Sequence, residues 1–91
     1  SMVLNDVEEV TGISGADILS RSQRGVLTDA RQLVYLCMRS RRHTFVSIAK
    51  AMNKLDHGTI TKGCRRISDL AVVERKTAAR IEAMRHKGYR V

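Results

Sequence analysis

Proline and tryptophan are absent from this 91-residue sequence, which has one phenylalanine and two tyrosines. Without proline, no position lacks the backbone donor that a helix interior needs. With so few aromatic rings, a core has to be built from aliphatic side chains, and single-stranded RNA or DNA would find few rings for base stacking. These absences favour one small all-α domain, residues 1–91, and argue against a single-strand binder.

Long apolar runs and cysteine pairs are also missing. No stretch of about 18 apolar residues occurs, so no membrane span is expected, and no signal peptide is recognisable. Cys37 and Cys64 are too few for a disulfide framework, and both fall on expected apolar helix faces. We therefore expect buried free thiols and a cytoplasmic protein.

Signatures of catalysis and of metal binding are absent too. The spacings of His43, His57 and His86 relative to the cysteines match no zinc signature. There is no glycine-rich phosphate loop, no nucleophile elbow and no acid pair placed for hydrolysis. The sequence predicts a protein that is not an enzyme and that needs no metal, cofactor or small-molecule substrate.

Positive charge is abundant. Lys and Arg number 17 against 9 Asp and Glu, which gives a formal net charge of +8 and an isoelectric point near 10.3. The first 19 residues hold four acidic residues and neither Lys nor Arg, whereas residues 20–44 hold six Arg and one Asp. This uneven distribution predicts that one face meets a polyanion, most simply nucleic acid.

The stretch from Asp56 to Ile67 predicts a helix that begins at Asp56, whose carboxylate suits the orphan amides of a first turn. Ile60, Cys64, Ile67 and Ala71 recur at helical spacing and define one apolar face. The opposite face carries small, cationic and acidic residues, namely Gly58, Lys62, Arg65, Arg66 and Asp69.

A shorter helix is predicted just upstream, over Thr44–Met52, and Asn53–Leu55 forms a tight connection to the next. Two helices joined by so short a turn, the second basic on its outer face, are the pattern of a helix-turn-helix. A helix that enters the major groove needs short residues at its N-terminus and donors that reach bases and phosphates. An ordinary solvated basic helix is the competing interpretation.

The remaining segments follow from capping residues and periodicity. A first helix is predicted from about Asp6 to Thr11 with Gly12 as its stop, a second from Ser14 to Leu19, an exposed basic loop from Ser20 to Gly25, and a long helix with Thr28 as N-cap and Asp29 in its first turn. Residues after 71 continue a helical pattern through Val72, Val73, Ala78, Ala79, Ile81 and Met84 to about Lys87, with Gly88 as the stop. Whether the helix breaks between residues 68 and 73 is open.

The block Asp56-His57-Gly58-Thr59-Ile60, followed by Cys64-Arg65-Arg66-Ile67, resembles the signature D-H-[ST]-T-[VI]-x-x-[AG]-C-[RK]-[KR]-[IV]. That signature belongs to the DNA-binding C-terminal domain of the bacterial replication initiator DnaA. The resemblance covers residues 4–71, because the segment before the block also matches that domain's first helices, its basic loop and its Arg-Gln pair. It implies an all-α, Trp-repressor-like bundle with a helix-turn-helix, to which residues 72–91 add a helical tail.

The resemblance also implies roles for individual residues on double-stranded DNA. Asp56, His57, Gly58 and Thr59 fall on base-contacting positions, Arg31, Gln32 and Arg66 fall on phosphate-contacting positions, and the loop with Arg21, Gln23 and Arg24 lies along the minor groove. Lys62 joins this set from its place on the outer helix face. The chain departs from the family at Gln23, Leu55 and Gly58, where the family has an arginine, a basic residue and a hydroxyl residue.

The resemblance stops short of the family's ATPase domain, so the chain is either an excised domain or a free-standing regulator. The predicted function is sequence-preferring binding of duplex DNA. The alternative is a protein-interaction module that binds an acidic partner through its basic helical surface. The oligomeric state is open.

Overall fold

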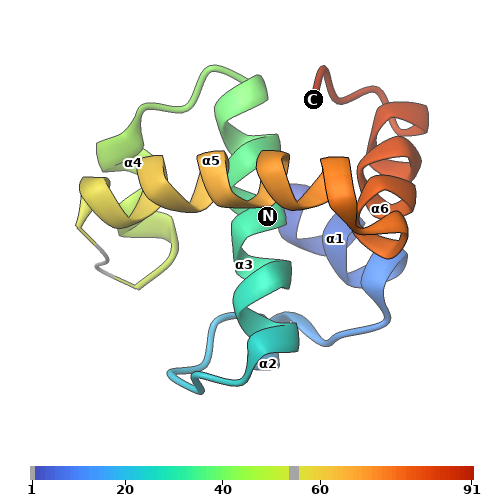
Figure 1. Ribbon diagram of the computed structural model, residues 1–91. Coiled ribbons are helices and arrows are strands. Elements are labelled where there is room, and N and C mark those ends of the chain that lie inside the picture. The colour runs from blue at the N-terminus through green and yellow to red at the C-terminus, as the bar shows by residue number, and fades with distance from the viewer. Residues whose placement is uncertain (1, 54–55) are drawn as a thin grey trace.

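The computed structural model describes residues 2–53 and 56–91, and in these ranges every regular element is a helix. The helices are α1 (Met2–Thr11), α2 (Gly15–Ile18), α3 (Gly25–Ser40), α4 (Phe45–Ala51), α5 (His57–Val73) and α6 (Arg75–His86). Figure 1 shows α5 crossing α3, with α4 near the start of α5 and α6 beyond its end. The predicted all-α fold is confirmed.

Side chains close the helix ends where the sequence predicted them to. The Ser14 hydroxyl accepts the amide of Asp17 at 3.1 Å. The Asp56 carboxylate accepts the amide of Thr59 at 3.0 Å. Gly12 has the predicted left-handed backbone, with φ of 74°, and follows the last residue of α1. These ends follow from local chemistry, which is why the sequence located them.

Two helix starts were predicted too late. α1 begins at Met2 rather than near Asp6, because Val3 and Val7 are both buried and extend the apolar face by one turn. α3 begins at Gly25, so Thr28 is not its N-cap: the Thr28 hydroxyl lies inside the first turn and donates to the carbonyl of Arg24 at 3.3 Å.

The core is aliphatic and draws on all six helices. Ile60 is fully buried and Ile67 is 2% exposed, as the predicted face of α5 requires, while Cys64 and Ala71 are half-buried at its edge. Both cysteines are free thiols. The fully buried side chains are Val7, Ile18, Val34, Cys37, Ile48, Ile60 and Met84.

The helix that begins at His57 ends at Val73, and this answers the open question of where it breaks. Glu74 is extended, with φ of −115° and ψ of 114°, and α6 starts at the next residue. Val72 and Val73 are helical, as the predicted pattern has them, but their side chains are 84% and 82% exposed. Gly88, with φ of 101°, is the predicted stop.

The C-terminal segment packs into the same core. Ile81 and Met84 of α6 are buried, and so is Tyr89, whose hydroxyl donates to the Asp6 carboxylate at 2.5 Å. The guanidinium of Arg41 lies 4.1 Å from the centre of the Tyr89 ring. Through Tyr89, the segment after α6 therefore contacts α1 and the end of α3. Of the predicted turn Asn53–Leu55, only Asn53 is among the described residues.

Candidate nucleic-acid interface

Packing against α4 positions the start of α5. Ile48 of α4 and Ile60 of α5 are both fully buried, and they belong to the core shared by the two helices. Burial of Ile60 turns the other side of the first turn outward. His57, Thr59 and Lys62 are exposed there, and Gly58 is half-buried. α4 and α5 thus have the arrangement of a helix-turn-helix whose second helix offers its N-terminal turn to a partner.

The first turn of α5 is held by two bonds between the same two residues. Besides the capping bond to the Thr59 amide, the Thr59 hydroxyl lies 3.3 Å from the other carboxylate oxygen of Asp56. These bonds, the Thr59 amide first, hold the pKa of the Asp56 carboxyl below its ordinary value. Asp56 is therefore ionised at neutral pH, and its charge and the Thr59 side chain are oriented together.

The loop between α2 and α3 supplies a second set of exposed polar side chains. Arg21, Gln23 and Arg24 are all exposed. Short side chains shape the loop from within: the amide of Ser22 donates to the Ser20 hydroxyl, and the amide of Arg24 donates to the Ser22 hydroxyl. The loop therefore has a defined path while its cationic side chains point to solvent.

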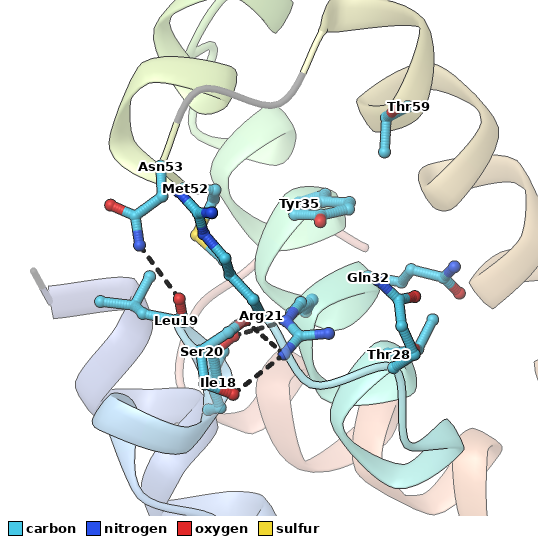
Figure 2. A pocket seen from close by; sticks show the side chains of 12 residues that line it. Ile18, Leu19, Ser20, Arg21, Thr28, Gln32, Tyr35, Met52, Asn53 and Thr59 are labelled. Carbon is cyan, nitrogen blue, oxygen red and sulfur yellow. Dashed lines mark hydrogen bonds between the residues drawn. The ribbon is translucent and has the colours of Figure 1, made fainter.

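A groove of about 500 Å³ separates the loop from the start of α5 (Figure 2). Five of the predicted residues line it, namely Arg21, Gln23, Arg31, Gln32 and Thr59. Ile18, Leu19, Tyr35 and Met52 give it an apolar floor, and Ser20, Thr28 and Asn53 complete its lining. The loop and the start of α5, far apart in sequence, thus face one space.

Arg31 lies at the base of this groove with its guanidinium turned toward the loop. Its Nε donates to the carbonyl of Ile18 at 2.6 Å. Its Nη1 donates to the carbonyl of Ser22 at 2.7 Å, and its Nη2 to the carbonyl of Ser20 at 2.6 Å. In this structure the side chain is half-buried and all three of its nitrogens are engaged with the protein.

Arg66 and Gln32 are also brought together, across the crossing of α5 and α3. Nη1 of Arg66 lies 2.6 Å from the Asp29 carboxylate and 2.8 Å from the Gln32 amide oxygen. The Arg66 side chain remains 51% exposed. The contact turns the amide oxygen of Gln32 toward Arg66, and it leaves part of the guanidinium free for an outside anion.

Asn53 and Thr28 line the groove and were missed by the sequence analysis. Asn53 follows α4 with φ of 67°, a left-handed conformation that asparagine adopts more readily than most residues. Its side-chain amide donates to the carbonyl of Leu19 at 3.0 Å (Figure 2). An Asn just past a predicted helix was a signal for that backbone conformation, but nothing in the sequence pointed to Leu19.

In the described ranges, residues 2–53 and 56–91, no three His, Cys, Asp or Glu side chains converge as metal ligands would. None of the helices in those ranges combines the length and hydropathy needed to cross a membrane. Burial raises the pKa of the Cys37 thiol to about 12 and also raises that of Cys64, so both thiols stay protonated at neutral pH.

No curated protein and no solved structure gives a significant match to the chain. A family model does match, the one described as the bacterial dnaA protein helix-turn-helix, and it covers residues 1–67. This range includes the capped first turn of α5, the loop and the groove between them. Domains of this family bind double-stranded DNA and are not catalytic. The chain therefore belongs to the bacterial DnaA helix-turn-helix family.

Proposed function

We propose that this domain binds duplex DNA with sequence preference, with the N-terminal turn of α5 in the major groove and the α2–α3 loop along the adjacent minor groove. The observation that carries the proposal is the shared groove: the exposed start of α5 and the basic loop face one space of about 500 Å³. One sugar-phosphate strand separates a major from a minor groove, so a protein that reads both grooves must straddle it.

Within this arrangement the side chains fall into groups according to the part of the DNA that each one contacts. Asp56, His57, Gly58 and Thr59 meet base edges, and the Thr59 methyl is suited to a thymine methyl. Lys62, Arg66 and Gln32 meet phosphates, while Arg21, Gln23 and Arg24 follow the minor groove. Arg31 belongs to the interface by its position at the base of the groove. Gln23 and Gly58 differ from the residues that the family has there, so the preferred site should differ from the standard DnaA box.

The family supports a place in replication initiation or its regulation. A chromosomal site of this kind puts the protein on the nucleoid. One module with one recognition helix suffices for a short asymmetric site, so we propose that it binds as a monomer.

Selection from a randomised duplex library tests the proposal and reports the site. The selected duplex and a scrambled duplex are then titrated at two or more salt concentrations. Four exposed cations at the interface, Arg21, Arg24, Lys62 and Arg66, give an expected slope of log affinity against log salt of about −3 to −4. An affinity that does not depend on salt, or a library that yields no enriched sequence, would contradict the proposal.

Thr59→Ala and Thr61→Ala form a matched pair for the base-reading surface. Thr61 is exposed on the same helix, and its hydroxyl donates to the carbonyl of His57 within that helix. We expect Thr59→Ala to cost about 1–3 kcal/mol on the selected duplex and little on the scrambled one. Thr61→Ala should change neither by more than about 0.5 kcal/mol. Thr59→Ser retains the hydroxyl near Asp56 and so separates loss of the methyl from loss of that contact.

An equal loss on both duplexes for Thr59→Ala would show that α5 does not read bases there. Each variant is first melted without DNA, because Thr59 is part of the helix cap. An acidic protein partner, the competing function, predicts that an unrelated polyanion such as heparin competes as well as the selected duplex does.

A further inference from the structure

Ile18 is the last residue of α2, and Leu19, Ser20 and Ser22 lie in the loop that follows, so the carbonyls of these four residues have no partner within a helix. In this structure each accepts a hydrogen bond from a side chain outside the loop, either on α3 or just after α4. Arg31 supplies three of these bonds, at 2.6, 2.7 and 2.6 Å. Asn53 supplies the fourth, to Leu19, at 3.0 Å.

We infer that Arg31 and Asn53 together form a clamp that docks the basic loop onto α3 and onto the residue that follows Met52, and so fixes the spacing between the loop arginines and the start of α5. The donors come from both sides of the groove. Arg31 lies in the second turn of α3, and Asn53 lies in the connection that leads into α5. Figure 2 shows the bond from Asn53 to Leu19 as a dashed line.

The chemistry suits a clamp better than a phosphate contact at Arg31. A guanidinium is a rigid planar fork, and here three nitrogens of that fork reach three separate carbonyls 9, 11 and 13 residues away in sequence. A phosphate bound by the same N–H groups would replace their hydrogen bonds to the carbonyls of Ile18, Ser20 and Ser22. Arg31 is therefore a positioning residue that acts through the loop, and it carries no share of the salt dependence.

A pre-shaped loop binds more tightly because the cost of ordering it is met during folding rather than on binding. The expected signature of losing the clamp is lower affinity with a preserved charge count. The part of this inference that concerns DNA rests on the proposed function, whereas the state of the loop in the free protein does not.

Backbone ¹⁵N relaxation of the free protein tests the clamp without DNA. We expect order parameters of about 0.8 for residues 19–24 in the parent, and a fall below about 0.6 in Arg31→Lys and Arg31→Gln. Asn53→Gly removes only the side chain from a left-handed position that glycine adopts freely. It should loosen residues 19–20 most. Unchanged order parameters in all three variants would overturn the clamp.

DNA titration then separates positioning from phosphate contact. Lysine keeps the charge but lacks the fork, so a clamp predicts that Arg31→Lys and Arg31→Gln both lose about tenfold in affinity, with the salt slope unchanged within about half a unit. A phosphate contact predicts that Arg31→Lys retains affinity within about twofold, while Arg31→Gln lowers the slope by about 0.9. The second result would overturn the inference.

Arg75→Lys is the matched control, because Arg75 is exposed at the start of α6 and does not line the groove. It should retain affinity within about twofold. All variants are compared at a temperature well below their melting points, measured beforehand. If the parent fails to bind any duplex, the proposed function fails, and the order parameters of the loop still decide whether the clamp exists.

Discussion

Gly63 lies where α5 crosses α3, and replacing it with alanine tests how closely the two helices approach. A Cβ at this position would lie 2.7 Å from Cδ2 and 3.0 Å from Cε2 of Tyr35, and 3.1 Å from Cγ of Gln32. The Tyr35 ring is 3% exposed, so it can yield only by shifting packed neighbours or by entering the groove it lines. The DnaA signature accepts either Gly or Ala here, yet this chain has no room for the extra methyl.

Two effects of opposite sign decide how much Gly63→Ala changes the free energy of unfolding. Alanine in a helix interior is favoured over glycine by about 1 kcal/mol. Overpacking a well-packed contact costs about 1–3 kcal/mol, and a contact of 2.7 Å with a buried ring belongs in the upper part of that range. We therefore expect Gly63→Ala to lower the free energy of unfolding by about 1–2 kcal/mol, which lowers the melting temperature by about 4–15 °C.

Gly25→Ala is the matched control, since a Cβ there meets nothing within 4 Å and Gly25 is the first residue of α3. Thermal and urea unfolding followed by circular dichroism should show the control at or above the parent and Gly63→Ala below it. A double-mutant cycle with Tyr35→Leu should recover at least about 0.5 kcal/mol of the loss. If Gly63→Ala melts at or above the parent, the reasoning about the helix crossing is refuted.

Three further tests probe the core and the cap. Ile67→Asp places an unpaired carboxylate at a site 2% exposed, so we expect a loss of several kcal/mol and the disappearance of the helical circular dichroism signal; an unchanged melting curve would mean that the wrong face of α5 was assigned. Met84→Ala, at a fully buried position, should cost about 2–5 kcal/mol in urea unfolding, whereas Ala79→Ser on the exposed side of α6 should be nearly neutral. Titration followed by NMR should give Asp56 a pKa below its ordinary value of about 3.9. Its contribution to stability is therefore present above about pH 4 and is lost as the pH falls through the folded-state pKa. Asp56→Asn should remove this contribution to the loss of stability in acid.

Features decided by neighbouring residues were predictable from the sequence. Ser14 and Asp56 cap helices through amides three residues away, and Gly12 ends α1 through its own backbone conformation. The buried face of α5 followed from the spacing of Ile60 and Ile67. The exposed loop and the outer face of α5 could be placed because charge and small residues gather there, although the roles of those residues on DNA stay predictions.

Features decided by distant partners were not predictable. Thr28 has the chemistry of an N-cap, but α3 starts three residues earlier, at Gly25, and places Thr28 inside its first turn. The hydrogen bonds of Arg31 could not be predicted, because their acceptors are backbone carbonyls, which every residue has and which no motif marks. Val72 fits a helical apolar period, yet it is exposed because α5 ends one residue later and the chain turns at Glu74.

The family match ends at residue 67, but the packed core does not. α5 continues to Val73, α6 packs against α1 and α5, and Met84 is as deeply buried as Ile60. The bond from Tyr89 to Asp6 joins the two ends of the described chain, 83 residues apart in sequence. The groove between the loop and α5 is lined by residues 18–59 and by none that follow. Residues 75–91 therefore stabilise α5 by completing the core against which α1, α3 and α5 pack.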